Sequence, residues 1–160
     1  MAYVPKDAEW YIAGIIMEFT IEGDPRNVVH VNSLLVHASS PEDAYEKAID
    51  LGKSEENVYL NTDNKQVAVK FRGLSNLIVI HDQLEHGEEL FFREQVGVPQ
   101  SEITKIVREK SELGVFAPDE DRQDIPNYMP QRVMRMLESQ ARKQDNLPDT
   151  LPPYPEPPGL

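Results

Sequence analysis

Two strand patterns separated by a very short turn constrain the fold more than any other feature of the chain. Residues 10–21 alternate between a fully apolar face and a mixed face, which is typical of a central β-strand. Residues 27–38 alternate again, and Glu22-Gly23-Asp24-Pro25 between them is typical of a turn. Because so short a connection joins antiparallel neighbours, the sequence predicts a β-hairpin and disfavours a Rossmann-type fold.

Residues 39–52 carry the clearest helix signal in the chain. Ser40 is a good N-cap, Pro41 suits the first helical position, and two acidic residues follow at the positive end of the helix dipole. Ala44, Tyr45, Ala48 and Ile49 form an apolar stripe at helical spacing, and the alanines are small enough for close packing on a sheet. Gly52 is expected to end the helix in a left-handed conformation.

The remaining patterns predict further strands and one short helix. Strands are expected at residues 57–61, 66–72, 76–81 and 88–96, a helix at 101–107, and a final short strand at Leu113, Val115 and Phe116. In residues 66–72, Val67, Val69 and Phe71 are expected to point inward. The predicted class is α+β: a mostly antiparallel sheet of about five to six strands with one or two helices packed on one face.

The composition changes at Ala117, which predicts five regions. They are an N-terminal arm (1–8), an α+β domain (9–116), an acidic linker (117–126), an amphipathic helix (127–144) and a proline-rich tail (145–160). The tail holds six of the thirteen prolines and is expected to form extended polyproline segments but no core. The helix and the tail form a C-terminal extension to the predicted domain.

Composition and charge exclude several classes of protein. The chain has no cysteine, so disulfides, thiolate nucleophiles and cysteine-ligated metals are excluded. It has no apolar stretch of membrane-spanning length and no apolar leader, so we expect a cytoplasmic protein without a membrane partner. A net charge of −12 makes nucleic-acid binding unlikely, although residues 126–143 alone carry +3.

Several of these segments resemble a known family. The Trp10-Tyr11 pair, the block NVVHVNSLLVHASSPEDAYEKAIDLG, the segment FRGLSNL (71–77) and the segment HGEELFF that starts at His86 are similar to the bacterial domain of unknown function family 4288. The resemblance covers residues 9–116 and leaves the C-terminal extension outside it. It implies a small cytosolic α+β module, and because the family is uncharacterised it implies no reaction and no site residues.

Two groups of polar residues are candidate ligand sites. Trp10, Arg26, His30 and Asn32 would suit an anionic ligand if the first two strands bring them into one concavity. His81, Glu85 and His86 flank a predicted turn and could hold a divalent metal, whereas His30 and His37 fall on opposite strand faces. The alternatives are ordinary packing and surface roles for the first group and a solvated acidic turn for the second.

The C-terminal extension carries the stronger functional signal. The chain has no nucleotide-binding, nucleophile-elbow, zinc-protease or EF-hand motif, so we expect no cofactor and favour a non-enzymatic protein. The first hypothesis is a protein-interaction module or accessory subunit that docks on a partner or a neighbouring subunit, in a homo-oligomer. A small-ligand or metal-binding enzyme is the alternative, and an unstructured, solubilising tail is the alternative role for residues 145–160. The residues expected to dock are Met129, Arg132, Val133, Arg135, Met136, Leu137 and Tyr154.

Overall fold

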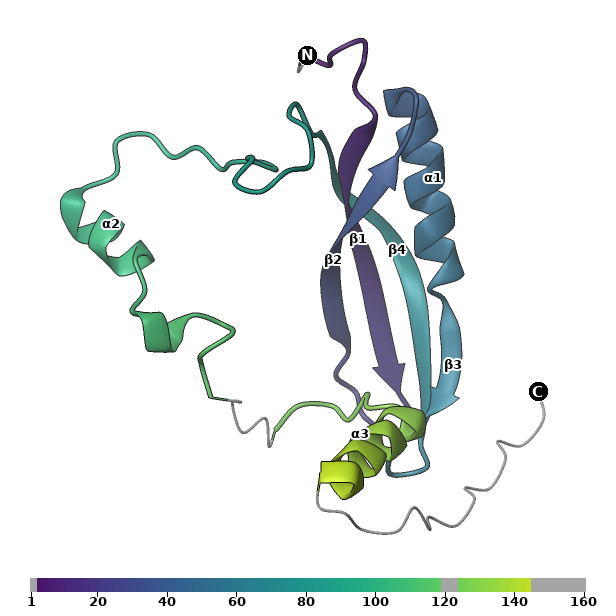
Figure 1. The fold of residues 1–160 in the computed structure, drawn as a ribbon. Coiled ribbons are helices and arrows are strands. Elements are labelled where there is room, and N and C mark those ends of the chain that lie inside the picture. Colours follow the sequence, from purple (N-terminus) through teal and green to yellow (C-terminus); the bar gives the residue numbers. More distant parts are fainter. Residues whose placement is uncertain (1–2, 119–123, 145–160) are drawn as a thin grey trace.

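The computed structural model describes residues 3–118 and 124–144 and has an α+β fold with one antiparallel sheet (Figure 1). The sheet has four strands in the order β2-β1-β4-β3. The strands are β1 (Trp10–Ile21), β2 (Val28–His37), β3 (Asn57–Leu60) and β4 (Gln66–Val79). The helices are α1 (Pro41–Ser54), α2 (Gln100–Ile106), the 3₁₀ helix η1 (Lys110–Glu112) and α3 (Gln131–Gln144).

The predicted class is confirmed, but the predicted count of five to six strands is wrong. Residues 66–72 and 76–81 were expected as two strands, yet β4 runs from Gln66 to Val79 without a break. Its pairing with β1 shifts register twice, and Gly73, at φ 131°, lies opposite Ile16 at one of the shifts. Glycine adopts this conformation without strain, so β4 continues through the irregularity at Gly73. In the sequence the same glycine looks like the end of a strand.

Residues 88–96 and 113–116 form no strand, which also lowers the strand count. The short helix expected at 101–107 is confirmed as α2, but it has no buried residue. From residue 93 to residue 118 only Val98 is even partly buried. We call residues 93–118 the projecting segment, because Figure 1 shows it standing away from the sheet on the side opposite α1.

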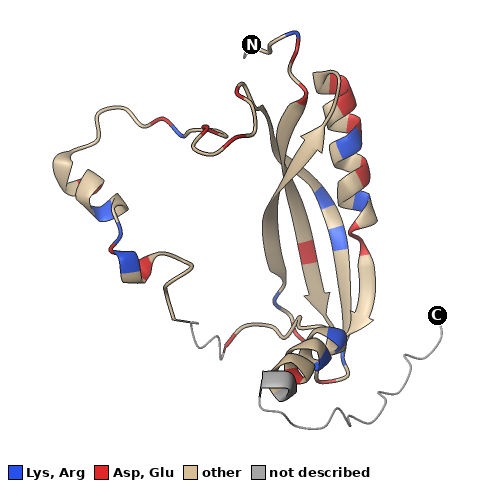
Figure 2. Cartoon of the chain, in the orientation of Figure 1, with Lys and Arg blue, Asp and Glu red and all other residues tan. Residues whose placement is uncertain are grey.

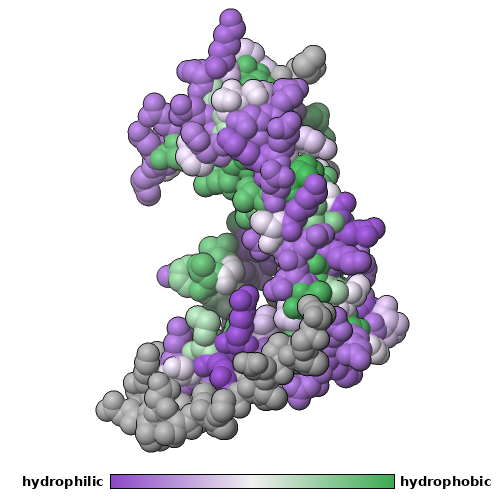
Figure 3. All heavy atoms as spheres, turned by 90° about the vertical axis from the view of Figure 1, so that its right-hand side faces the viewer, coloured by the Kyte–Doolittle hydropathy of each residue, from purple (hydrophilic) through white to green (hydrophobic). Residues whose placement is uncertain are grey.

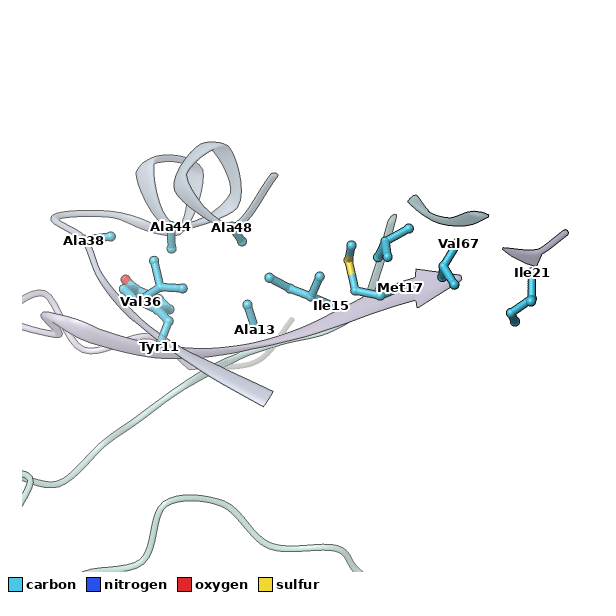
Figure 4. Packing of buried hydrophobic residues seen from close by; sticks show 11 residues of the cluster. Tyr11, Ala13, Ile15, Met17, Ile21, Val36, Ala38, Ala44, Ala48 and Val67 are labelled. Atoms are coloured by element: carbon cyan, nitrogen blue, oxygen red, sulfur yellow. The ribbon is translucent and has the colours of Figure 1, made fainter. Parts of the chain in front are cut away.

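The core lies between one face of the sheet and α1. Tyr11, Ala13, Ile15 and Met17 of β1 are buried on this face, as their alternation predicts. Ala44 and Ala48 are fully buried where α1 meets the sheet, and Figure 4 shows both above β1. Small side chains at these two positions let the helix approach the strands closely, whereas Tyr45, expected on the same stripe, is exposed.

The caps of α1 explain its bounds. The Ser40 side chain accepts a hydrogen bond from the Asp43 N–H (3.1 Å), which confirms the predicted N-cap. The helix does not end at Gly52, however, but continues to Ser54. A Cβ atom at Gly52 would lie 2.4 Å from the Phe71 ring, so this glycine is needed for close packing within the helix.

Candidate protein-interaction site

The segment that leads into α3 docks on the far end of the sheet. We call residues 124–130 the strap. It was expected to be the end of a linker and the start of a helix, yet α3 begins only at Gln131. A bridge pairs Asn61 with Pro130, and Pro126 is buried. The chain therefore returns to its own domain before α3 starts.

Asn61 anchors the strap from the β3–β4 turn. It is the buried polar residue of the described core, with 0% of its surface exposed. Its Oδ1 accepts hydrogen bonds from the N–H groups of Asp63 and Lys65, both at 2.9 Å, and its Nδ2 donates to the carbonyl of Asn127 at 2.7 Å. One amide therefore shapes the turn and binds the strap at once, with both of its polar atoms paired.

Asn127 binds the same turn in the opposite direction. Its Nδ2 donates to Thr62 Oγ1 at 2.8 Å and to Asp63 Oδ2 at 2.7 Å. Its Oδ1 accepts the N–H of Met129 at 3.2 Å. The Asn61 side chain thus binds the backbone of the strap, and the Asn127 side chain binds the β3–β4 turn. Together these bonds fix the position of the strap at the end of the sheet.

Tyr128 extends the core over the half of the sheet that α1 leaves open. It packs against the core cluster, and its ring centroid lies 5.2 Å from that of Phe19 and 5.3 Å from that of His30. The hydroxyl of Tyr59 donates a hydrogen bond to the Tyr128 carbonyl. Burial raises the pKa of the Tyr59 hydroxyl, nearby Tyr128 raises it further, and Arg132 opposes the shift.

Arg26 holds the beginning of the strap. Its guanidinium donates to both carboxylate oxygens of Asp24 at 3.1 Å and to the carbonyl of Asp124 at 3.2 Å. The hydrogen bonds from Arg26 lower the pKa of the Asp24 carboxyl. Since Arg26 and Asp124 are exposed, their ion pair positions the strap more than it stabilises the fold.

The strap places α3 at the end of the sheet with an apolar surface exposed. Gln131 Nε2 donates to Asn64 Oδ1 at 2.6 Å, which joins the first turn of α3 to the β3–β4 turn. Beyond it, Met136 is 62% exposed and Leu137 is 50% exposed. Of the other residues expected to dock, Met129 and Arg132 are exposed, Val133 and Arg135 are half-buried, and Tyr154 lies outside the described residues.

The structure does not bring the expected anion-binding group together. His30 pairs with Met17 and Trp10 pairs with His37, seven residues apart along β1. At roughly 3.4 Å per residue, Trp10 and His30 lie more than about 20 Å apart. The ring of Trp10 instead contacts His37 at 4.8 Å, and Arg26 binds Asp24 and the strap. The prediction assumed correctly that the two strands pair, but it placed residues from opposite ends in one concavity.

The expected metal group is not assembled either. Within residues 3–118 and 124–144, no group of three or more His, Asp or Glu side chains is arranged to hold a metal ion. His81, Glu85 and His86 therefore do not converge, and His81 stacks on Tyr3 with a centroid distance of 6.4 Å. The physical reason is that residues 81–99 form no strand, so no hairpin draws the two sides of the turn together.

A cavity of about 360 Å³ opens at the other end of the sheet, and the sequence did not indicate it. Tyr11, Leu77 and Val79 line it from the sheet, and Leu90, Phe91 and Phe92 line it from the segment after β4. Burial raises the pKa of the Tyr11 hydroxyl, with Asp43 and then Glu42 adding to the shift. The wall is largely apolar, which suits an apolar ligand better than a charged one.

Asn61, Asn127 and Tyr128 are the functional candidates that sequence reasoning missed. Residues 61–64 have the composition of a turn, and a buried anchor looks the same in sequence as an exposed turn residue. One signal was available: the strap contains Pro126 and Pro130, and a proline disfavours a helical conformation in the residue before it. This pattern favours an extended segment over the helical start expected at residue 127.

Comparisons with known proteins identify a family and no function. Neither a curated protein nor a solved structure matches the chain. No helix of the described residues is long and apolar enough to cross a membrane. A family model described as Domain of unknown function (DUF4288) matches residues 10–92, which include the whole sheet, α1 and the residues that line the cavity except Val4. The match covers more than half of the chain, so this protein belongs to the DUF4288 family.

Proposed function

We propose that this protein is a non-enzymatic protein-interaction module whose helix α3 docks on a partner protein. The observation that carries the proposal is the strap, which anchors the start of α3 to the β3–β4 turn while Met136 and Leu137 stay exposed. Because the strap already fixes one end of α3 on the domain, the helix loses less conformational freedom when it binds a partner. The strap therefore lowers the entropy cost of association.

The chemistry of α3 selects the kind of partner. Met136 and Leu137 are adjacent and Val133 lies one turn before Leu137, which is the spacing that places anchors into an apolar groove. Residues 126–143 carry a charge of +3 in a chain of net charge −12. Figure 2 shows the basic residues of α3 at the lower end of the molecule. We therefore expect an apolar groove with an acidic rim on the partner.

Site-specific photo-crosslinking in cells tests the proposal. A photoreactive residue is placed at Met136 or Leu137, with the exposed Tyr45 of α1 as the matched control position. We expect one protein to be crosslinked from both α3 positions and not from Tyr45, through a segment with apolar and acidic residues. Arg132→Glu together with Leu137→Ser should remove that product while the folded domain is kept.

Two results would contradict the proposal. Equal crosslinking from Tyr45 and from the α3 positions would mean that α3 has no partner of its own. Products that join α3 only to the strap or to the β3–β4 turn would mean that the helix packs within its own chain. If α3 crosslinks to a second copy of this chain, the partner is a neighbouring subunit and the acidic groove must lie on this protein.

The cavity supports a second candidate function, the binding of a small apolar ligand. Its volume of about 360 Å³ falls in the range of ligand pockets, and aromatic side chains line it on one side. A thermal-shift screen of apolar metabolites tests this role, because a ligand at a hundred times its dissociation constant adds about 2.7 kcal/mol to stability. Leu90→Trp should fill the space and remove any such shift. A shift that persists in this variant would place the ligand elsewhere.

A further inference from the structure

β2 is an edge strand that lacks the usual protection of an edge. In the order β2-β1-β4-β3 it pairs with β1 alone, and no other strand of the described residues lies beside it. Its ten residues, VVHVNSLLVH, contain no Asp, Glu, Lys, Arg, Pro or Gly. Figure 2 shows it as an uncoloured strand in a chain with many charges. Soluble proteins protect such edges with charged residues, prolines or bulges, and an unprotected edge pairs readily with another strand.

The outer face of the same strand is apolar and open. Val29, Val31 and Leu35 point away from α1 and are 52%, 60% and 51% exposed. Their neighbours in register on β1 are Glu18, Ile16 and Ile12. The apolar strip therefore continues onto β1 beside Val31 and Leu35, whereas the charged Glu18 lies beside Val29. Figure 3, which looks from the side of α1, shows hydrophobic atoms around a hollow at mid-height of the molecule, and the outer face of β2 points away from this view.

The chain also carries apolar side chains that lie outside its core. The projecting segment leaves 25 of its 26 residues exposed. Seven of them are large hydrophobic residues with at least two fifths of their surface exposed: Val96, Ile103, Ile106, Val107, Leu113, Val115 and Phe116. So much exposed apolar surface on a single segment is typical of an interface.

We propose that two copies of this chain form a two-fold dimer in which β2 pairs with β2 of the second copy. The projecting segments then cover the outer face of the joined sheet. The pairing must be antiparallel and must keep Val29, Val31 and Leu35 of both strands on one face, because a slip of one residue would invert every side chain. This dimer goes beyond the proposed docking of α3 and uses different residues.

A second copy fits this surface better than another protein does. Both halves of the interface, an open apolar face and a segment with exposed apolar side chains, occur on the same chain. Identical chains of charge −12 repel each other, so self-association requires contact through an uncharged strip, and β2 is such a strip. A two-fold axis also closes the assembly at two copies, since each chain has one free β2 edge.

Light scattering on the purified full-length chain tests the dimer. We expect a mass twice that of the 18.2 kDa chain. Val31→Lys places a charge on the open face of the edge strand and should return the mass to 18.2 kDa. Tyr45→Lys makes the same kind of change on the exposed surface of α1 and should leave the dimer intact. The fold of each variant is checked by circular dichroism.

Crosslinking gives an independent readout, because the natural chain has no cysteine. A single Ser33→Cys, near the middle of β2, should form a disulfide between two copies under mild oxidation, and Tyr45→Cys should not. A wild-type mass of one chain, an assembly larger than two, or equal crosslinking at both positions would overturn the proposal. If Val31→Lys fails to fold, the wild-type mass and the cysteine pair still decide it. The α3 variants should leave the dimer unchanged, so this test and that of the proposed function fail separately.

Discussion

Replacing Asn61 with alanine tests whether the strap is part of the folded domain. The side chain is fully buried and makes three hydrogen bonds, two within the β3–β4 turn and one to the strap. At about 1 kcal/mol for each bond, Asn61→Ala would cost about 3 kcal/mol in the free energy of unfolding. Asp63 and Lys65 are exposed, so water can replace part of the turn bonds, which lowers the expected loss to about 2 kcal/mol.

Denaturant unfolding followed by tryptophan fluorescence measures this loss. Trp10 is the single tryptophan and lies at the other end of the sheet, so its signal reports the unfolding of the whole domain. For a domain of this size, 1 kcal/mol corresponds to about 4–8 °C in Tm, so the variant should melt roughly 8–16 °C lower. Asn57→Ala is the control, because Asn57 is exposed and, among the described residues, its side chain accepts a hydrogen bond only from the adjacent N–H of Val58.

The reasoning is refuted if Asn61→Ala and Asn57→Ala lose the same amount. A second comparison uses a chain that ends at Phe116, in which Asn127 is absent. If Asn61 stabilised only the turn, Asn61→Ala would cost the same free energy of unfolding in this shorter chain as in the full chain. We expect the cost of Asn61→Ala to be smaller in that shorter chain, since the bond from Nδ2 to the Asn127 carbonyl no longer exists. An equal cost in both chains would mean that the strap is not docked.

Three further predictions follow from packing, burial and the strap. Gly52→Ala should destabilise the domain by about 1–2 kcal/mol in chemical denaturation although alanine favours helices, because its Cβ meets the Phe71 ring; Lys53→Ala should not. The pKa of the half-buried Tyr59 hydroxyl is raised, so its contribution to stability is full below about pH 10, where the tyrosine of the unfolded chain stays neutral. This contribution is lost as the pH rises through the folded-state pKa. Tyr59→Phe should therefore flatten the fall in urea midpoint above that pH, and an unchanged slope would count against the assignment. Truncation after Phe116 should leave a chain that unfolds at lower urea than the full chain, because Tyr128 no longer covers Phe19 and His30; an unchanged midpoint would show that the strap adds nothing.

The packing of α1 on β1 was predictable because the local sequence patterns of both elements agree with their contacts in the fold. The alternation of β1 predicted its buried face, and Ser40, Pro41 and the two alanines predicted the start and the packing face of α1. At Gly52 the same logic failed. The sequence shows a glycine near a helix end, which usually forms a cap, whereas only the structure shows the Phe71 ring against it.

The candidate sites were harder to predict because they depend on which strand ends meet. Trp10 and His30 lie on paired strands, yet the register that separates them is set by the turn at residues 22–27 and not by the residues themselves. Asn61 has the composition of a turn residue in sequence, since its partner Asn127 is 66 residues away. The α3 residues were found because an amphipathic pattern is local, but the strap that positions them is a long-range contact.

The strap also changes what the C-terminal extension can do. A linker followed by a free helix would allow the extension to exchange between subunits, but here residues 124–131 bind their own β3–β4 turn through four side-chain hydrogen bonds. The segment left free is instead residues 93–118, which starts beyond one end of the sheet, and the strap, which follows it in the chain, lies at the other end. Because both of its ends lead back to the same domain, it can cover a neighbour while its own chain stays folded. Association through β2 would then leave α3 exposed on each copy, and a dimer with two α3 helices would bind a partner with two acidic grooves more tightly than one copy does.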